Sequence, residues 1–428
     1  MQSRKKFLRY TAGIAAASAG LPLLRLENFH QIIEDIQHVQ GSSDEIARNE
    51  GYWHYIQQAF TVDRSIINLN NGGVSPSPAV VQDAMKRHLD YSNKAPTYTM
   101  WRVLDPQKEG VRQRLAVMFG VDTEEIAIVR NASEGLQICQ QGIDLQPGDE
   151  VLTTTQDYPR MITTFKQRER RDGIKLRQFP IPIPAEDDDE IVRLFESNIT
   201  QDTKLILMCH MINITGQILP VKKVVEMARK YDIPVIVDGA HTFAHFNFDH
   251  SDLGCDFYAT SLHKWLFAPH GTGMLYVRND KVNSLWPLMA APETLDSDIR
   301  KFEEFGTHPA ANFIAIAEAL SFHEAIGADR KQARMKYLND YWIDQVMESD
   351  RVRLHTSRNP NFACGIATIQ IEGINSNELA SRLWSDHKII VTPIMHDEFE
   401  GIRITPNVYT TLHELDRFIS AIKNTIAD

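Results

Sequence analysis

Short apolar runs recur between about residues 124 and 277, and several are separated by longer patterns typical of helices, such as Val221–Tyr231. The runs are three to five residues long: Ile126–Val129, Glu150–Thr154, Leu205–Met208, Val235–Val237, Phe257–Ala259 and Met274–Val277. Apolar runs of this length that alternate with helices predict a mostly parallel β-sheet covered by helices on both faces.

The pattern changes after about Gly306. A long helical stretch over Ala311–Ile326 is followed by strand patterns at Gly365–Ile371 and Gly401–Ile404. A chain of 428 residues exceeds what one compact core usually carries. We therefore predict an α/β protein with a large domain and a smaller α+β domain, to which the segment around Ile66–Gly73 contributes. The predicted parts are an N-terminal segment over 27–75, a large domain over 76–305 and a small domain over 306–428.

Polar side chains follow five successive predicted strands. The residues concerned are Asn131, Ala132, Ser133, Asp157, Tyr158, His210, Asn213, Asp238, His241, Ser261, His263 and Lys264. In an open parallel sheet the carboxyl ends of the strands meet along one edge, which is where ligands bind in such folds. We therefore expect a functional site at this edge.

Asp238 and Lys264 indicate the chemistry of this site. Asp238 ends the strongly apolar run IPVIVD, so a carboxylate there needs a cationic partner to remain ionised. That partner could be Lys264, Arg403 or the protonated ring nitrogen of a bound heterocycle. Pyridoxal phosphate (PLP) needs such an acid, and its aldehyde needs a lysine that loses its proton readily.

The remaining polar residues supply the other groups that PLP requires. NASEGL (Asn131–Leu136) is a suitable helix N-terminus for a phosphate, to which Ser261 and His263 can also donate. Ser133 and Ser261 could equally serve as helix caps. Tyr158 can stack on the ring, and Asn213 and His241 can hydrogen-bond its hydroxyl group.

The ordered set of motifs resembles the class V aminotransferase family of fold-type-I PLP enzymes, which includes cysteine desulfurases and isopenicillin N epimerase-like proteins. The resemblance runs from about Asn68 to the C-terminus. It rests on NLNNGGVSPSP, NASEGL, HMINITG, VDGAH, SLHKW, EFGTHP and GIRITP.

The resemblance implies roles for individual residues. Lys264 and Asp238 would be catalytic and would bind PLP, and Arg403 would bind the substrate carboxylate. Thr307 would reach the phosphate in the neighbouring subunit of a homodimer, which accords with the symmetry of most oligomers. The other implied PLP ligands are Ala132, Ser133, Tyr158, Asn213, His241, Ser261 and His263, and the opening segment would place Asn71 and Gly73 near the substrate.

Two departures separate the chain from the desulfurases within this family. Thr392–Arg403, which matches the segment that carries the desulfurase nucleophile, has no cysteine, and Cys364 lies too early, within a predicted strand. Tyr158 stands where desulfurases have histidine. We therefore expect an epimerase-like aminotransferase or epimerase that acts at Cα of an amino acid or peptide-like metabolite. A PLP-dependent lyase and a non-catalytic ligand-binding protein are the alternatives.

Charge and cysteine content exclude other classes. The net charge of −11 argues against a nucleic-acid-binding surface, and the basic run Lys166–Arg171 contains a glutamate, as expected of a solvated helix face. The four cysteines form no CxxC pair and lie among apolar residues, so we predict buried thiols.

Two further site types are disfavoured. His241 and His245 have the i,i+4 spacing of zinc ligands on a helix, but no glutamate follows the first histidine as in HExxH. A serine hydrolase is disfavoured because no GxSxG motif is present.

The N-terminal segment Met1–Leu26 has a basic start followed by a short apolar run, and it resembles a twin-arginine export signal. Lys5 replaces the second arginine, and no A-x-A site follows. The apolar run is too short to span a membrane stably. We expect a periplasmic protein with no membrane anchor once the signal is removed; the alternatives are a cytoplasmic location and an N-terminal helix that stays attached.

Overall fold

A computed structural model describes residues 39–427 of the chain. The predicted export signal over residues 1–26 lies outside this range. Within it, no helix combines the length and apolar character that a membrane-spanning segment needs. All four cysteines are buried free thiols, which confirms the prediction.

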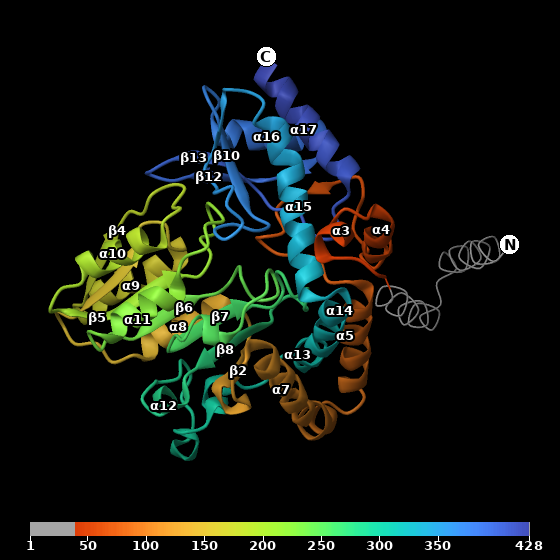
Figure 1. Ribbon diagram of the computed structural model, residues 1–428. Helices are drawn as coiled ribbons and strands as arrows, with labels where there is room; N and C mark the ends of the chain where they lie inside the picture. The colour runs from red at the N-terminus through yellow and green to blue at the C-terminus, as the bar shows by residue number, and fades with distance from the viewer. Residues whose placement is uncertain (1–38, 428) are drawn as a thin grey trace.

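A seven-stranded sheet forms the centre of the molecule (Figure 1). Its strands, in spatial order, are β2 (Ile126–Val129), β8 (Gly273–Val277), β7 (Phe257–Ser261), β6 (Val235–Asp238), β5 (Thr203–Cys209), β3 (Glu150–Thr154) and β4 (Lys175–Phe179). All neighbouring strands are parallel except β8, which runs antiparallel to both β2 and β7. The six predicted strands are therefore confirmed, as is the mostly parallel sheet.

Helices cover both faces of this sheet, and the alternation of side chains along each strand decides which core each residue joins. Ile128 and Val237 join one core together with helices α7 (Lys108–Phe119), α10 (Asp188–Asn198) and α11 (Val221–Arg229). Val129 and Ile236, one residue away, join the opposite core with α8 (Ala132–Gly142) and α9 (Pro159–Asp172). Burial on both faces explains the near-continuous apolar runs.

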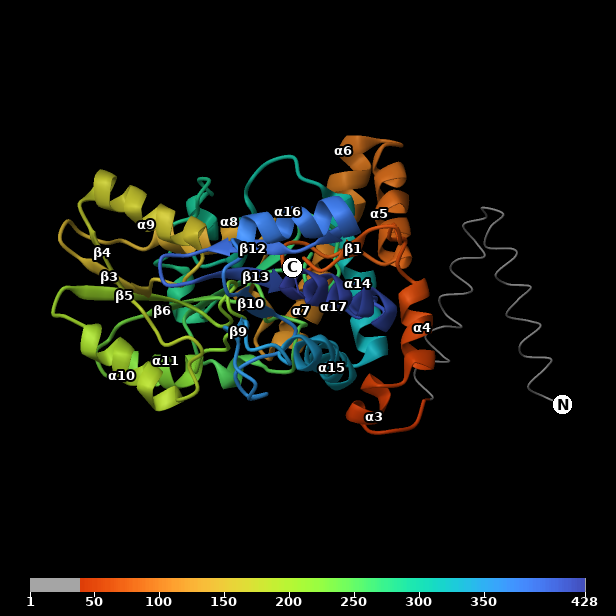
Figure 2. The same ribbon diagram turned by 90° about the horizontal axis from the view of Figure 1, so that it is seen from above.

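The C-terminal part contains a four-stranded antiparallel sheet. Its strands are β12 (Thr392–Met395), β13 (Glu400–Ile404), β10 (Ala367–Ile371) and β9 (Val352–Leu354). Three helices pack with it in one core and are seen from above in Figure 2: α15 (Ala328–Val346), α16 (Ser376–His387) and α17 (Leu412–Ala427). The strand β1 (Ile67–Asn68) pairs in parallel with β11 (Ile389–Ile390), so residues near both ends of the described chain meet here.

Seven further helices complete the described part of the chain. They are α3 (Ser43–Ala47), α4 (Glu50–Gln58), α5 (Ala79–Ser92), α6 (Pro96–Tyr98), α12 (Asn279–Val282), α13 (Ala310–Ile314) and α14 (Ile316–Ile326). The helices within residues 43–92 and 316–326 lie along one side of the molecule (Figure 1). Short π or 3-10 turns span Thr99–Leu104, Asp105–Gln107, Thr123–Glu125, His250–Asp252, Glu293–Leu295 and Ile299–Glu303.

Three local predictions need correction. The helical stretch over 311–326 is divided at Ala315 into α13 and α14. Arg168, in the basic run predicted to be a solvated face, is buried because its guanidinium donates to the carbonyls of Gln140 and Ile143. Cys364 precedes β10 and does not lie within a strand.

Candidate active site

Lys264 lies just after β7, at the carboxyl end of the strand. Its Nζ is 3.2 Å from Nε2 of His241, which follows β6. Burial lowers the pKa of Lys264 to about 8, although the charge of Asp238 acts in the opposite direction. The amine therefore loses its proton more readily than an exposed lysine does, as a nucleophilic or basic lysine requires.

Asp238 is the last residue of β6 and is 4% exposed. Its Oδ1 accepts a hydrogen bond of 2.9 Å from the amide of Ala240. Burial raises the pKa of the Asp238 carboxyl to about 6, against the opposing effects of this hydrogen bond and of the Lys264 charge. Because no side-chain cation among residues 39–427 forms a hydrogen bond with it, the carboxyl suits a cationic group on a ligand.

His241 is held in a tight turn after β6. Gly239 makes this turn possible, because a Cβ on it would lie 2.0 Å from the Tyr258 ring. Burial, followed by the nearby charge of Lys264, lowers the pKa of His241 well below its usual value, so the ring is neutral. Its Nδ1 is buried and has no hydrogen-bond partner in the described part of the chain.

The N-terminus of α8 lies beside β7. Asn131 caps this helix by accepting from the amide of Glu134 at 2.9 Å, so the cap is Asn131 and not Ser133, which is half-buried in the first turn. Oγ of Ser261 accepts from the amide of Ala132 at 3.0 Å and joins the helix to the strand. Gly273 permits this close approach, since a Cβ there would lie 2.6 Å from Cα of Asn131.

His263 borders the same region. Its Nδ1 lies 3.1 Å from the carbonyl of Thr272. Burial lowers the pKa of His263 to about 4, so the ring is neutral near pH 7 and Nδ1 carries the proton that the carbonyl accepts. In this neutral form the Nε2 atom is an acceptor.

Arg403 enters the site from the C-terminal sheet. Alternation along β13 places Ile402 and Ile404 in the core, and Arg403 on the opposite face. Its guanidinium donates to the carbonyl of Asn213 (3.0 Å) and to Oδ1 of Asn70 (2.8 Å). All these partners are neutral. Burial lowers the pKa of Arg403 to about 10, so it stays charged near neutral pH.

Two observations suit Arg403 to a ligand carboxylate. Its Nε is buried without a hydrogen-bond partner, and none of the ion pairs found among the described residues involves it. A guanidinium presents several donors in one plane and recognises carboxylates through two parallel hydrogen bonds.

Asn70 is a site residue that sequence reasoning missed. Its Oδ1 accepts from both Arg403 and Thr392, the latter at 2.7 Å. Asn71, which the resemblance placed near the substrate, is instead fully buried. Its side-chain amide donates to the carbonyls of Asn68 and Thr405. The only available signal was the pair of asparagines in NLNNGG, which does not show which one faces the site. Gly73 is exposed, and its amide donates to Asn70.

The other predicted residues differ in burial, and the backbone of Asn213 contacts Arg403. Oδ1 of Asn213 is buried without a partner among the described residues, and Tyr158 is half-buried at the start of α9. Thr307 is exposed in the single chain. His245 does not share a face with His241: it bonds to the carbonyl of His241 and to the amide of Gly365.

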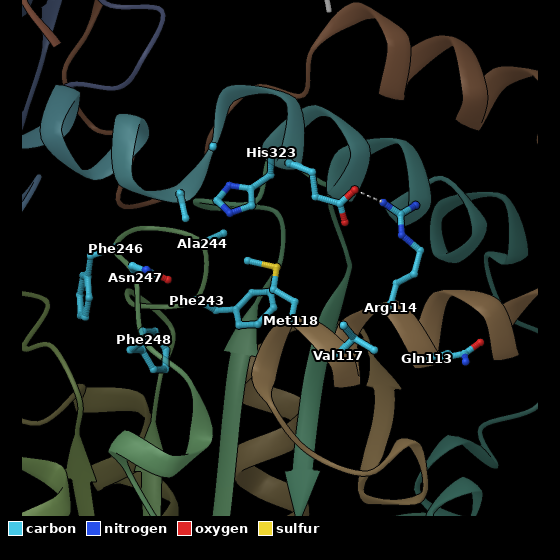
Figure 3. Close-up of a pocket in the computed structure, with 13 residues that line it drawn as sticks. Gln113, Arg114, Val117, Met118, Phe243, Ala244, Phe246, Asn247, Phe248 and His323 are labelled. Carbon is cyan, nitrogen blue, oxygen red and sulfur yellow. Dashed lines mark hydrogen bonds and ion pairs between the residues drawn. The ribbon is translucent and has the colours of Figure 1, made fainter. Parts of the chain in front are cut away.

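A separate cavity of about 470 Å³ is lined in part by the segment 243–248, which follows His241 in the chain (Figure 3). Phe243, Phe246 and Phe248 line it from that segment, and Met118 and His323 line it from helices α7 and α14. None of the predicted site residues lines this cavity.

The residues at the sheet edge fit PLP. A buried acid lies where a ring cation can meet it, a readily deprotonated lysine lies beside a neutral histidine, and a capped helix N-terminus lies within the same edge. When bound, PLP supplies an aldehyde that links covalently to an amine and a protonated ring that accepts electrons from the substrate Cα.

The aminotransferase class-V family model matches residues 67–398. The chain belongs to this family, its fold is that of the fold-type-I PLP enzymes, and its cofactor is pyridoxal phosphate. This membership confirms the resemblance on which the sequence interpretation was built.

Named relatives include epimerases, cysteine desulfurases and a hercynylcysteine sulfoxide lyase of Schizosaccharomyces pombe, which is 25% identical over 296 residues covering 67% of this chain and 75% of the relative. Isopenicillin N epimerase of Streptomyces clavuligerus is 27% identical over 387 residues, which cover 86% of this chain and 97% of the relative. A probable cysteine desulfurase of Halalkalibacterium halodurans is 24% identical over 402 residues, which cover 87% of this chain and 97% of the relative.

Among solved structures, a C-DES mutant with glycine covalently linked to its PLP cofactor has a similar fold. Its TM-score is 0.77 at 21% identity, and the match covers 86% of this chain and 98% of that chain.

Proposed function

We propose that this class V PLP enzyme acts at Cα of a substrate that carries an amino group and a carboxylate, as an aminotransferase or an epimerase on an amino acid or peptide-like metabolite. The observation that carries the proposal is the buried Arg403, whose guanidinium is held by neutral partners and has no carboxylate partner in the described chain. Such an uncompensated cation suits a substrate carboxylate.

The proposed roles follow from position and protonation. Lys264, with a pKa lowered to about 8, takes up and returns the Cα proton. Asp238 keeps the ring nitrogen of the cofactor protonated, and His241 lies within 3.2 Å of Nζ of Lys264, where it orients the amine. Arg403 fixes the carboxylate and therefore the direction in which the Cα–H bond points.

We also propose that the enzyme is not a cysteine desulfurase, and two observations support this part of the proposal. The segment 392–403 forms the hairpin of β12 and β13 and contains no cysteine. Cys364 is buried, and burial raises the pKa of its thiol to about 12, so it would not supply a thiolate nucleophile.

A substrate screen in deuterated water tests the proposal. We expect Lys264-dependent deuterium uptake at Cα of free amino acids or short peptides. Release of a 2-oxo acid only with an amino acceptor would identify transamination, and inversion at Cα would identify epimerisation. Elimination of a β-substituent would support the lyase alternative, and formation of alanine from cysteine would contradict the exclusion of desulfuration. Lys264→Ala is the matched inactive control.

We also propose that the enzyme is a homodimer and that it reaches the periplasm through its twin-arginine-like N-terminus. The exposure of Thr307 supports the first part, since a partner subunit could reach this residue. A fusion of Met1–Leu26 to a reporter that is exported only when folded tests the second; retention of the reporter in the cytoplasm would contradict it.

A further inference from the structure

Two buried side chains outside the predicted site, His245 and Lys331, hold the residue that follows Lys264. We infer that they are positioning residues that keep Lys264 and His241 in their reacting arrangement. This inference rests on the proposed function of that site. His245 acts through the backbone carbonyl of His241 and through the ring of Trp265, and Lys331 acts through the carbonyl of Trp265.

His245 joins three segments of the chain. Its Nδ1 lies 2.7 Å from the carbonyl of His241, and its Nε2 lies 2.9 Å from the amide nitrogen of Gly365. An amide N–H can only donate, so Nε2 accepts and Nδ1 carries the proton. The ring also stacks on Trp265, with 3.7 Å between centroids and 11° between planes.

The protonation of His245 does not change near neutral pH. Burial lowers its pKa to about 3, although the hydrogen bond to His241 acts in the opposite direction. The tautomer that donates to His241 is therefore present across the range in which Lys264 and Asp238 titrate.

Lys331 holds the other side of Trp265. It lies in α15 and is fully buried, and its Nζ donates to the carbonyl of Trp265. The same Nζ lies 3.8 Å from the centroid of the Phe267 ring, and burial lowers the pKa of Lys331 well below its usual value. Phe267 has a φ of 65°, which is strained for a non-glycine residue and persists only where its surroundings fix it.

These contacts connect the site to the C-terminal part of the chain. Gly365 approaches His245 closely, since a Cβ on it would lie 2.6 Å from Nε2. Asn339 of α15 donates to the carbonyl of the adjacent Cys364 at 2.6 Å. The positions of Lys264 and His241 therefore depend on how α15 and the segment before β10 pack against them.

The test compares His245→Ala and Lys331→Met with a matched control, His250→Ala, in the PLP-bound enzyme. His250 is half-buried and, like His245, lies in the connection between β6 and β7. Its Nε2 lies 3.2 Å from the carbonyl of Cys255, and it does not contact the candidate active site. The first readout is the pH midpoint of the absorbance band of PLP linked to Lys264. The second readout compares how far each variant changes kcat with how far it changes KM.

We expect His245→Ala and Lys331→Met to shift the midpoint by about one pH unit and to lower kcat about tenfold or more, with KM within about threefold. His250→Ala should lower the melting temperature but leave the midpoint unchanged. Unchanged midpoints and kcat in the two variants, together with lower melting temperatures, would overturn the inference and leave only a structural role.

Two features keep the test decisive. If His245→Ala does not fold, His245→Gln, which retains a donor and an acceptor but loses the stacked ring, replaces it and should shift the midpoint in the same direction. Measuring the pH midpoint of the absorbance band requires only PLP bound to Lys264 and no substrate. The measurement therefore tests the positioning role even if the enzyme turns over none of the proposed substrates.

Discussion

Single residues in this site are set to unusual protonation states by burial. The pKa of Asp238 is raised to about 6, and that of Lys264 is lowered to about 8. Both shifts disfavour the charged form, which shows that desolvation outweighs the mutual attraction of the two groups. A bound PLP ring would reduce the cost of burying the Asp238 carboxylate, because it would give this group a cationic partner.

The cost of burying Lys264 leads to a stability prediction for the cofactor-free protein. The folded pKa lies below the unfolded value of 10.5, so the unfolded chain binds the proton more tightly and Lys264 destabilises the fold fully below about pH 8. Lys264→Met should raise the free energy of unfolding at pH 7 by about 1–3 kcal/mol. This gain should shrink as the pH rises from about 8 to 10.5.

Denaturant unfolding of cofactor-free protein at pH 7 and pH 10 measures this effect. Lys222→Met, an exposed change on α11, is the control and should alter stability by less than about 0.5 kcal/mol. A Lys264→Met variant that is less stable than wild type at pH 7 would show that the amine makes a favourable interaction which outweighs its desolvation.

Arg403 is predicted to act through geometry as well as charge. Arg403→Lys keeps a cation but loses the planar donors, so KM for substrates with a free carboxylate should rise about 10- to 100-fold, with a smaller change in kcat. Steady-state kinetics measure this, and amidated substrates should discriminate much less between the two enzymes. Arg353→Lys, an exposed change on β9, is the control. An equal rise in KM for amidated substrates would show that Arg403 does not bind the carboxylate.

Residue-level prediction from the sequence succeeded where a strand end fixed the position. The position of Lys264 beside His241 followed from the carboxyl ends of neighbouring strands. Asn70 and His245 were missed because their roles depend on contacts with Arg403 and Gly365, which lie far away in the chain. Sequence spacing carries no information about such long-range side-chain partners.

At the scale of elements, buried strands were predictable, including the edge strand β2, and the exposed edge strand β4 was not. β2, β3, β6, β7 and β8 are buried along their whole length and give short apolar runs. The edge strand β4, in contrast, is largely exposed and reads KLRQF, which has no apolar run. The division of the 311–326 helix at Ala315 also left no signal, because alanine favours helix.

A buried ion cluster fixes the element that precedes the predicted Thr307 segment. Glu303 accepts from the amide of Ile128 in β2 at 2.6 Å and pairs with Arg112 at 2.5 Å and with Lys108 at 3.0 Å. Burial alone would raise the pKa of the Glu303 carboxyl, but the charge and hydrogen bonds of Arg112 outweigh it and lower the pKa.

Removing this carboxylate should destabilise the fold substantially. Glu303→Gln leaves Arg112 buried without its main counter-charge and should cost about 3–5 kcal/mol near neutral pH. Because the folded pKa is lowered, the contribution of Glu303 is present above its unfolded pKa and is lost as the pH falls through the folded value. The difference in free energy of unfolding between Glu303→Gln and wild type should therefore become smaller at acidic pH.

Chemical denaturation from acidic to neutral pH measures this difference in free energy of unfolding between Glu303→Gln and wild type. Glu348→Gln is the control, because Glu348 forms an exposed ion pair with Lys423 and should contribute less than about 1 kcal/mol. A Glu303→Gln variant whose stability matches that of this control would show that the cluster does not hold β2 to the following segment.

At the scale of the whole molecule, the site is assembled from segments far apart in the chain. Asn70 comes from the N-terminal segment, Lys264 from the central sheet and Arg403 from the C-terminal sheet. The sequence pattern predicted the α/β class and the mostly parallel sheet, since these depend on local periodicity. The domain boundaries and the subunit arrangement stay predictions, because neither leaves a periodic signal in one chain.

The predicted homodimer has a sharp consequence for Thr307. If Thr307 serves the neighbouring subunit, a heterodimer of one Lys264→Ala chain and one Thr307→Ala chain contains one intact site, made of Lys264 from the second chain and Thr307 from the first. Doubly tagged, purified heterodimers should then show about half the wild-type activity, one active site of two. Size-exclusion chromatography with light scattering confirms the oligomeric state of each sample.

The matched control places both changes in one chain. A heterodimer of the Lys264→Ala/Thr307→Ala chain with wild type has one site without Lys264 and one site without Thr307. Its activity should fall to about half that of a Thr307→Ala homodimer, well below that of the first heterodimer. If Thr307 served its own subunit, the order would reverse, because the wild-type chain of the control would hold a complete site. A monomeric protein with full activity would exclude a site shared between subunits and would contradict the predicted role of Thr307 in a neighbouring subunit.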